Sequence, residues 1–208
     1  MTTEVHAEPR PEQVAEKIAQ FRELFADAPA YAKAAVENVI DELKSQVASI
    51  EPASRMESAG RAGSRQGKVS ELTLIVPLAP GGAQRLRSFL QLLDGNFDGA
   101  DRVGTVHDMR FVFLDNDTKL LFATAYDGDW DVYIDDFAAK IPDYLDIISS
   151  AFLDWPGIHS PEAKDYFLKY QVTAEGWYVA NPDLTVVETR KLKRNGQALN
   201  EFLDKVGD

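Results

Sequence analysis

TVHDMRFVFLDNDTKLLFATA, residues 105–125, contains the pattern from which the rest of the architecture can be worked out. Residues 105–114 alternate, with Met109, Phe111 and Phe113 on one face of a predicted strand and Val112 and Leu114 on the other. The three residues 115–117 (DND) favour a tight turn, and residues 119–125 return as a second strand. The stretch therefore predicts an antiparallel hairpin that is apolar on both faces.

The residues on either side of this hairpin predict further strands and helices. Alternation predicts a strand over 71–78 before the hairpin and another over 176–180 after it. The 3.6-residue period predicts helices that follow residues 80–82, run from Ile134 to Phe152 with a bend at Pro142, and start again near residue 161. Thr185 and Glu188 form a capping-box pattern that opens a terminal helix, with Gly196 as its weak point. This order predicts an α+β, ferredoxin-like split βαβ fold: a four-stranded antiparallel sheet with helices on one face.

The distribution of helix and linker patterns divides the chain into three parts. Residues 1–50 carry two helical stripes on either side of Pro29 and predict an N-terminal helical hairpin. Residues 51–68 are rich in Ser, Gly and Ala and lack an apolar period, which predicts a linker. Residues 69–208 then form the ferredoxin-like domain.

Composition excludes several classes of protein. The chain has 208 residues, of which 45% are hydrophobic, so it can bury a sizeable core. With no cysteine, it has no disulfide scaffold or thiolate metal site. A net charge of −12 argues against binding nucleic acid or an anionic membrane surface. No apolar run is long enough to span a bilayer, so we expect a cytoplasmic protein.

The order of elements over residues 69–206, with the segments HDMRFVFLD and KLLFATAYDGDWDVYIDDF, resembles the dimeric α/β-barrel superfamily. Within it the chain is similar to a bacterial group with the same His–x–x–Arg–Phe strand. The superfamily includes cofactor-free and haem-degrading monooxygenases, chlorite dismutase-like proteins and dye-decolourising peroxidases. The resemblance implies a homodimer, closed through the uncovered sheet face with Met109, Phe111 or Phe113 buried. It also implies a pocket for an apolar or aromatic compound, oxidative chemistry, and haem as one possible cofactor.

His107 and Arg110 are the candidate catalytic residues, and they point to opposite faces of one strand. His107 shares its face with Met109 and is expected in the apolar interior, partnered by Tyr178. The candidate ligand-binding residues are Phe111, Trp177 and Tyr178. The alternative is a structural histidine beside a structural Asp108–Arg110 ion pair.

The sequence offers two further hypotheses, a calcium site in the acidic segment and a second function for the N-terminal helices. Asp127, Asp129 and Asp131 resemble the start of a calcium loop, but Val132 and Ala138 replace its glycine and glutamate, so no metal site is predicted. Aspartates also suit a helix N-terminus, which explains them without a metal. The second function is that of a non-catalytic dimeric interaction protein whose N-terminal helices bind a partner.

Overall fold

The computed structural model describes residues 11–46, 56–93 and 98–207, which divide into two compact units, Met1–Ala53 and Ser54–Asp208. The first unit contains α1 (Pro11–Leu24) and α2 (Ala30–Gln46). The Arg22 guanidinium joins them by donating to both carboxylate oxygens of Glu37, at 2.8 and 2.6 Å. Both predicted N-terminal helices are thus present; residues 1–10 and 47–50 of that prediction lie outside the described residues.

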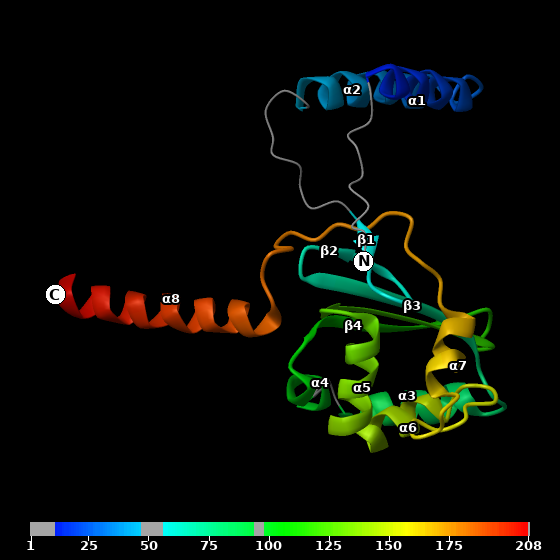
Figure 1. The fold of residues 1–208 in the computed structure, drawn as a ribbon, viewed down its shortest axis with the longest axis vertical. Coiled ribbons are helices and arrows are strands. Elements are labelled where there is room, and N and C mark those ends of the chain that lie inside the picture. The colour runs from blue at the N-terminus through cyan, green and yellow to red at the C-terminus, as the bar shows by residue number, and fades with distance from the viewer. Residues whose placement is uncertain (1–10, 47–55, 94–97, 208) are drawn as a thin grey trace, which may run out of the picture. The chain divides into compact units, whose positions relative to one another are not determined.

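The second unit is an α+β structure built on an open, antiparallel sheet of five strands (Figure 1). The strands are β1 (Glu57–Ser58), β2 (Ser64–Gln66), β3 (Val69–Pro77), β4 (Val106–Leu114) and β5 (Lys119–Asp127). Their order across the sheet is β1-β2-β3-β5-β4. The long strands β3 and β4 both pair with β5, so β5 lies at the centre of the regular part of the sheet.

One face of this sheet is covered by helices, as Figure 1 shows. These are α3 (Gly82–Leu93), α4 (Asp98–Val103), α5 (Trp130–Lys140), α6 (Pro142–Ser149) and α7 (Ala163–Tyr170). α5 and α6 together replace the single bent helix predicted over 134–152, and Pro142 opens the second of them. None of the helices in the described part of the chain is long and apolar enough to cross a membrane.

The β4–β5 hairpin confirms the prediction from residues 105–125. Asp115, Asn116 and Asp117 all have positive φ, at 50°, 51° and 67°, a region that Asn and Asp tolerate better than most residues. The Thr118 hydroxyl closes the turn by donating to the Asp115 carbonyl at 2.8 Å. The residues of this turn therefore set the register of β4 and β5.

Met109, Phe111 and Phe113 face the helical layer, which corrects their expected place in a dimer interface. Met109 and Phe111 contact the core beneath the sheet. Phe113 packs against Arg87 of α3, whose Cζ lies 4.0 Å from the centroid of the Phe113 ring. The opposite face carries Arg110, exposed, and Val112, which is 44% exposed. The alternation was predicted correctly, but the helices cover the face that carries the large aromatic side chains.

The predicted strand at 176–180 is not formed. After α7 the chain meets the free edge of β3 at one isolated bridge between Leu74 and Gln171. It then turns toward β2, where the Trp177 carbonyl accepts a hydrogen bond from the Gln66 side chain at 2.6 Å. The segment is thus held by separate contacts and not by a ladder. The sheet has five strands instead of four because β1 and β2 supply the additional pairing.

Residues 57–66 are structured, although their composition predicts part of a linker. Ala59 and Ala62 of the β1–β2 hairpin are buried, and the Ala59 carbonyl accepts the N–H of Trp130 at 2.9 Å. Gly63 has φ of +78°, and a Cβ there would lie 1.9 Å from the Glu71 carbonyl oxygen. The small residues allow close packing instead of flexibility. Residues 51–55 of the predicted linker lie outside the described residues.

Glu71 holds the hairpin, β3 and the segment after α7 together. Its carboxylate is almost fully buried and accepts hydrogen bonds from the Ser64 N–H at 3.1 Å, the Thr73 hydroxyl at 3.1 Å and the Ala174 N–H at 3.3 Å. These donors satisfy a charge that would otherwise be costly to bury.

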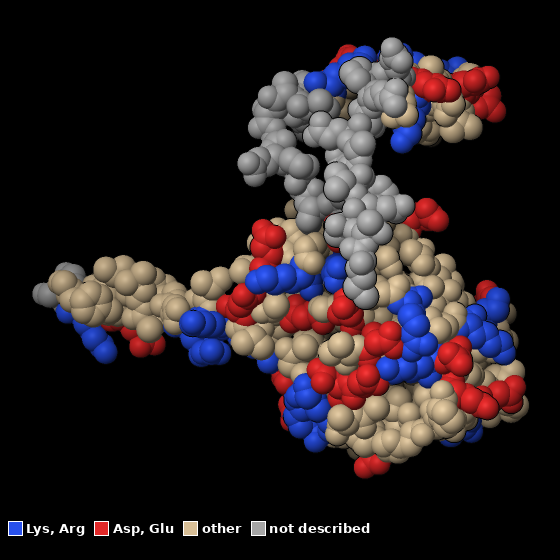
Figure 2. All heavy atoms as spheres, viewed as in Figure 1, with Lys and Arg blue, Asp and Glu red and all other residues tan. Residues whose placement is uncertain are grey.

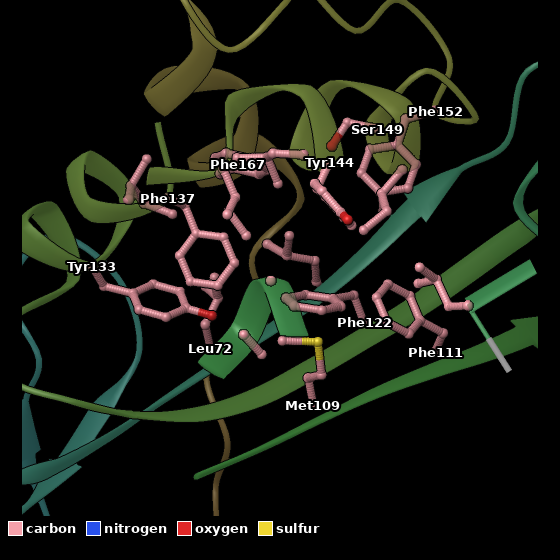
Figure 3. Close-up of a pocket in the computed structure, with 18 residues that line it drawn as sticks. Leu72, Met109, Phe111, Phe122, Tyr133, Phe137, Tyr144, Ser149, Phe152 and Phe167 are labelled. Atoms are coloured by element: carbon pink, nitrogen blue, oxygen red, sulfur yellow. The ribbon is translucent and has the colours of Figure 1, made fainter. Parts of the chain in front are cut away.

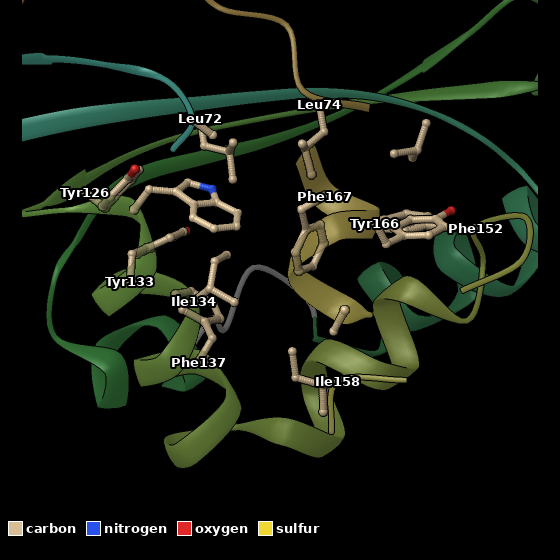
Figure 4. Packing of buried hydrophobic residues seen from close by; sticks show 14 of the residues in the cluster. Leu72, Leu74, Tyr126, Tyr133, Ile134, Phe137, Phe152, Ile158, Tyr166 and Phe167 are labelled. Atoms are coloured by element: carbon tan, nitrogen blue, oxygen red, sulfur yellow. The ribbon is translucent and has the colours of Figure 1, made fainter. Parts of the chain in front are cut away.

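The core lies between the sheet and the helices (Figure 4). Tyr126 of β5 stacks on Tyr133 of α5 with ring centroids 3.8 Å apart, and burial raises the pKa of both phenols. Trp130, at the start of α5, is fully buried. Aromatic side chains from a strand and the following helix therefore join the two layers.

The terminal helix α8 (Val186–Gly207) confirms the predicted helix and its capping box. The Thr185 hydroxyl accepts the Glu188 N–H at 3.2 Å, and the Glu188 carboxylate accepts the Thr185 N–H at 2.8 Å. Lys68 also donates to Glu188 at 2.8 Å, and Arg190 pairs with Asp101. These contacts tie the first turn of α8 to the β2–β3 connection and to α4.

The cap should give α8 a measurable acid sensitivity. Hydrogen bonds from Lys68 and then Thr185 lower the pKa of Glu188 from 4.5 to about 2. Because the folded pKa is depressed, this stabilisation is present above pH 4.5 and is lost as the pH falls toward 2. We expect Glu188→Gln to lower helicity at neutral pH, and wild type and variant to converge near pH 2 by circular dichroism. Glu201→Gln removes the same charge outside the cap, and its helicity should stay close to that of wild type over the whole pH range.

Candidate functional site: an apolar cavity beneath the sheet

A cavity of about 70 Å³ lies between the inner face of the sheet and the helices (Figure 3). The strands supply mainly apolar and aromatic walls, which are Leu72, Leu74, Met109, Phe111 and Phe122. The helices supply the remainder, including Ala100 of α4, Phe137 of α5 and Ile148 of α6. The side chains that alternate inward on the strands therefore meet one stripe of each helix around an empty space.

Three of the lining residues carry polar side-chain atoms: Tyr133, Tyr144 and Ser149. The phenol oxygens of Tyr133 and Tyr144 turn toward the cavity in Figure 3. The Tyr133 hydroxyl lies 3.2 Å from that of Thr124, so it already has a partner. Ser149 is 1% exposed, and its hydroxyl has no hydrogen-bond partner within the described part of the chain.

The Ser149 hydroxyl is the chemically notable feature of this wall. A buried hydroxyl without a partner costs about 1–3 kcal/mol. A bound molecule that offers one hydrogen-bonding group would recover that free energy. Apart from the phenol oxygens of Tyr133 and Tyr144, the remaining walls would contact the bound molecule only through apolar or aromatic surface.

Phe111 is the one predicted site residue that lines the cavity, where its ring centroid lies 5.1 Å from that of Phe122. His107 does not share this face, because the register shifts between Val106 and Asp108 and a bulge falls at the histidine. Its Nε2 lies 2.8 Å from Asp127 Oδ1, and the other oxygen of Asp127 accepts the Val186 N–H at 2.9 Å. His107 therefore contacts the residue that anchors α8, and its expected place in the apolar interior is wrong.

The other predicted site residues lie apart from the cavity. Arg110 is exposed and lies 3.7 Å from Asp108, which matches the structural alternative for this pair. Tyr178 is 84% exposed, so it is not the partner of His107. Trp177 is half-buried. The structure thus does not bring His107, Arg110, Trp177 and Tyr178 together, because the segment that carries the last two does not join the sheet.

Sequence reasoning missed Ser149 and Tyr144, which lie on α6. Leu145 and Ile148 of the same helix are partly buried and pack against the core. Nothing in the periodicity separates a helix face that fills a core from one that borders an empty space. A serine inside an apolar stripe, at the end of the helix, was the only available signal.

Asp127, Asp129 and Asp131 each have a different partner. Asp129 pairs with Arg65 at 2.5 Å, while Asp131 pairs with Arg61 at 2.5 Å and Lys164 at 3.1 Å. The Arg61 hydrogen bond lowers the pKa of Asp131. Figure 2 shows acidic and basic side chains interspersed over the body of this unit. No group of three metal-ligating side chains occurs within the described residues.

The cavity residues do not fit a haem group. Of the residues described around the cavity, none is histidine, and the space is far smaller than the porphyrin macrocycle. His107 lies outside the cavity and faces Asp127.

Comparison with known proteins identifies no family model, no curated protein and no solved structure that matches this chain.

Proposed function

We propose that this protein binds a small apolar or aromatic molecule that carries one hydrogen-bonding group. The observation that supports the proposal is the buried hydroxyl of Ser149, which has no partner among the described residues and borders a cavity whose other polar side-chain atoms are the phenol oxygens of Tyr133 and Tyr144. Apolar walls with a few polar groups that fix orientation are typical of small-molecule sites.

The size of the cavity limits the ligand. A single water needs roughly 10–15 Å³, whereas sites for drug-sized molecules occupy about 300–1,000 Å³. At about 70 Å³ the cavity suits a molecule of few non-hydrogen atoms, such as a simple phenol.

The lining favours binding over turnover. None of the described lining residues is His, Asp, Glu, Lys or Arg, so a general acid or base would have to be a tyrosine or Ser149. The oxidative activity implied by the superfamily resemblance therefore gains no support from these walls, and the proposal is limited to binding.

A titration with phenol and benzene tests the proposal. We expect wild-type protein to bind both probes, with phenol the tighter, because phenol can hydrogen-bond to Ser149. Ser149→Ala should bring the two affinities together, since its methyl group retains the apolar wall and removes the hydroxyl. NMR shift changes at the methyl groups of Leu72 and Ile148, followed during the titration, would locate the probe.

A substitution that fills the cavity should block binding of the probes. Ala100→Leu adds methyl groups to the wall and should abolish binding of both probes while the protein stays folded. Ala139→Leu, the same change at an exposed position of α5, and His107→Ala should bind as wild type does. Absence of probe binding to wild type, or retained binding in Ala100→Leu, would contradict the proposed site.

The N-terminal helices support a second candidate, a protein-interaction role. Leu24 and Tyr31 are 77% and 79% exposed, and Val39 and Leu43 of α2 are about half exposed. Exposed apolar side chains gathered on short helices are typical of recognition surfaces. The probe titration separates the candidates, because an interaction protein needs no ligand in the cavity.

A further inference from the structure

The terminal helix α8 presents an apolar stripe that no described part of its own unit covers. Every residue from 189 to 206 is exposed. The α8 stripe consists of five residues that are 54–68% exposed: Leu192, Leu199, Phe202, Leu203 and Val206. Uncharged surface runs along one side of the helix in Figure 2, opposite to most of its charges.

The spacing of the α8 stripe is that of a helix-pairing seam. Leu192, Leu199 and Val206 recur every seven residues, and Phe202 and Leu203 fall on the same side of the helix between the last two. Most of the stability of a helix in a protein comes from packing of its apolar face, so the apolar side of α8 is expected to be covered.

We propose that α8 pairs antiparallel with α8 of a second copy of this chain, with Leu199 at the two-fold axis. In this register, residues equally far from Leu199 in opposite directions face each other. Leu192 then meets Val206 of the second copy, and Phe202 meets its Gly196.

Gly196 supports this register. Glycine inside a helix costs about 1 kcal/mol relative to alanine, which calls for a compensating role. A Cβ at Gly196 would meet nothing within 4 Å in one chain, so the glycine is not required by packing within the described residues. Across the proposed pair it leaves room for the ring of Phe202, as a hole receives a knob.

The charges of α8 favour the antiparallel orientation. Its first half carries four cations and one acid that is already engaged by the cap; the cations are Arg190, Lys191, Lys193 and Arg194. The second half carries Glu201 and Asp204 against Lys205. Antiparallel pairing places the cationic half of one helix beside the half of the other that carries Glu201 and Asp204, whereas parallel pairing would place the two cationic halves together.

An anionic membrane is the competing occupant, because amphipathic helices with lysines also bind such surfaces. The net charge of −12 opposes it. Vesicles that contain phosphatidylserine therefore form one arm of the test. If the chain binds them while remaining monomeric without them, the proposal is overturned.

The chain has no cysteine, so single cysteines report the register directly. Paired helices lie about 8–10 Å apart, which brings facing Cα atoms within reach of a disulfide. Leu199→Cys in the full chain should cross-link to itself on oxidation. Leu192→Cys and Val206→Cys should cross-link only when mixed, because each lies about 21 Å along the axis from its own copy. Self-linking by all three variants would indicate parallel pairing and contradict the proposal.

Sedimentation of the full chain gives the second test. Leu199→Glu places two carboxylates together at the axis and should weaken the dimer at least about tenfold. Gln197→Glu makes the same charge change on the opposite side of α8 and should leave the dimer unchanged. Circular dichroism at low concentration should match for both variants, so that loss of the dimer is not loss of the helix. A wild-type chain that stays monomeric up to submillimolar concentration would overturn the proposal.

Discussion

Replacing Gly63 with alanine is expected to lower the free energy of unfolding by about 3–5 kcal/mol, from positive φ and a steric clash together. The added Cβ would lie 1.9 Å from the Glu71 carbonyl oxygen, so β3 and the β1–β2 hairpin must move apart. That movement also pulls the Ser64 N–H from the buried Glu71 carboxylate. Urea unfolding followed by tryptophan fluorescence measures the change.

Gly176→Ala is the matched control for this prediction. Its Cβ would meet nothing within 4 Å in the part of the chain that the structure describes, and the residue does not have positive φ. We expect its unfolding midpoint to stay within error of wild type. A Gly63→Ala protein as stable as this control would show that the hairpin is not packed on β3 as described.

Replacing Trp130 with alanine is expected to cost about 3–5 kcal/mol, the range for a large aromatic side chain removed from a core. Trp130 is fully buried and begins α5. The Cζ atom of Arg61 lies over its ring, 5.0 Å from the ring centroid. Its loss would leave an empty space where β5, α5 and the β1–β2 hairpin meet. Thermal unfolding by circular dichroism provides the measurement.

Trp130→Phe separates volume from hydrogen bonding at the same position. Within the described residues the indole N–H of Trp130 has no partner, so phenylalanine loses no hydrogen bond. We expect a clearly smaller loss than for alanine. Equal losses for the two variants would indicate that the indole N–H has a partner, and the packing argument would fail.

Local chemistry made part of the fold predictable. The alternation of residues 109–113, the DND turn and the capping box at Thr185 each act over a few residues, and each forms as predicted. The hairpin of Ser, Gly and Ala residues at 57–66 was not predictable, because its packing depends on Glu71 and Trp130. Composition alone suggests flexibility there.

The cavity illustrates a second limit. Phe111 was identified as a ligand-binding candidate from its strand, and it does line the cavity. His107, four residues before Phe111 on β4, was placed wrongly. One extra residue at the bulge turns its side chain away from the expected face. Ser149 could not be identified from the sequence, because its significance is that its buried hydroxyl has no hydrogen-bond partner among the described residues.

β4 is the outermost strand on its side of the sheet, so one row of its backbone N–H and C=O groups faces no other described strand. Such an edge can recruit strands from other molecules and begin aggregation. The bulge at His107 interrupts the regular edge, and the exposed charges of Asp108 and Arg110 oppose the approach of a flat apolar strand. Residues that resemble a catalytic group in the sequence are thus well suited to keep this protein from forming fibrils through its own sheet.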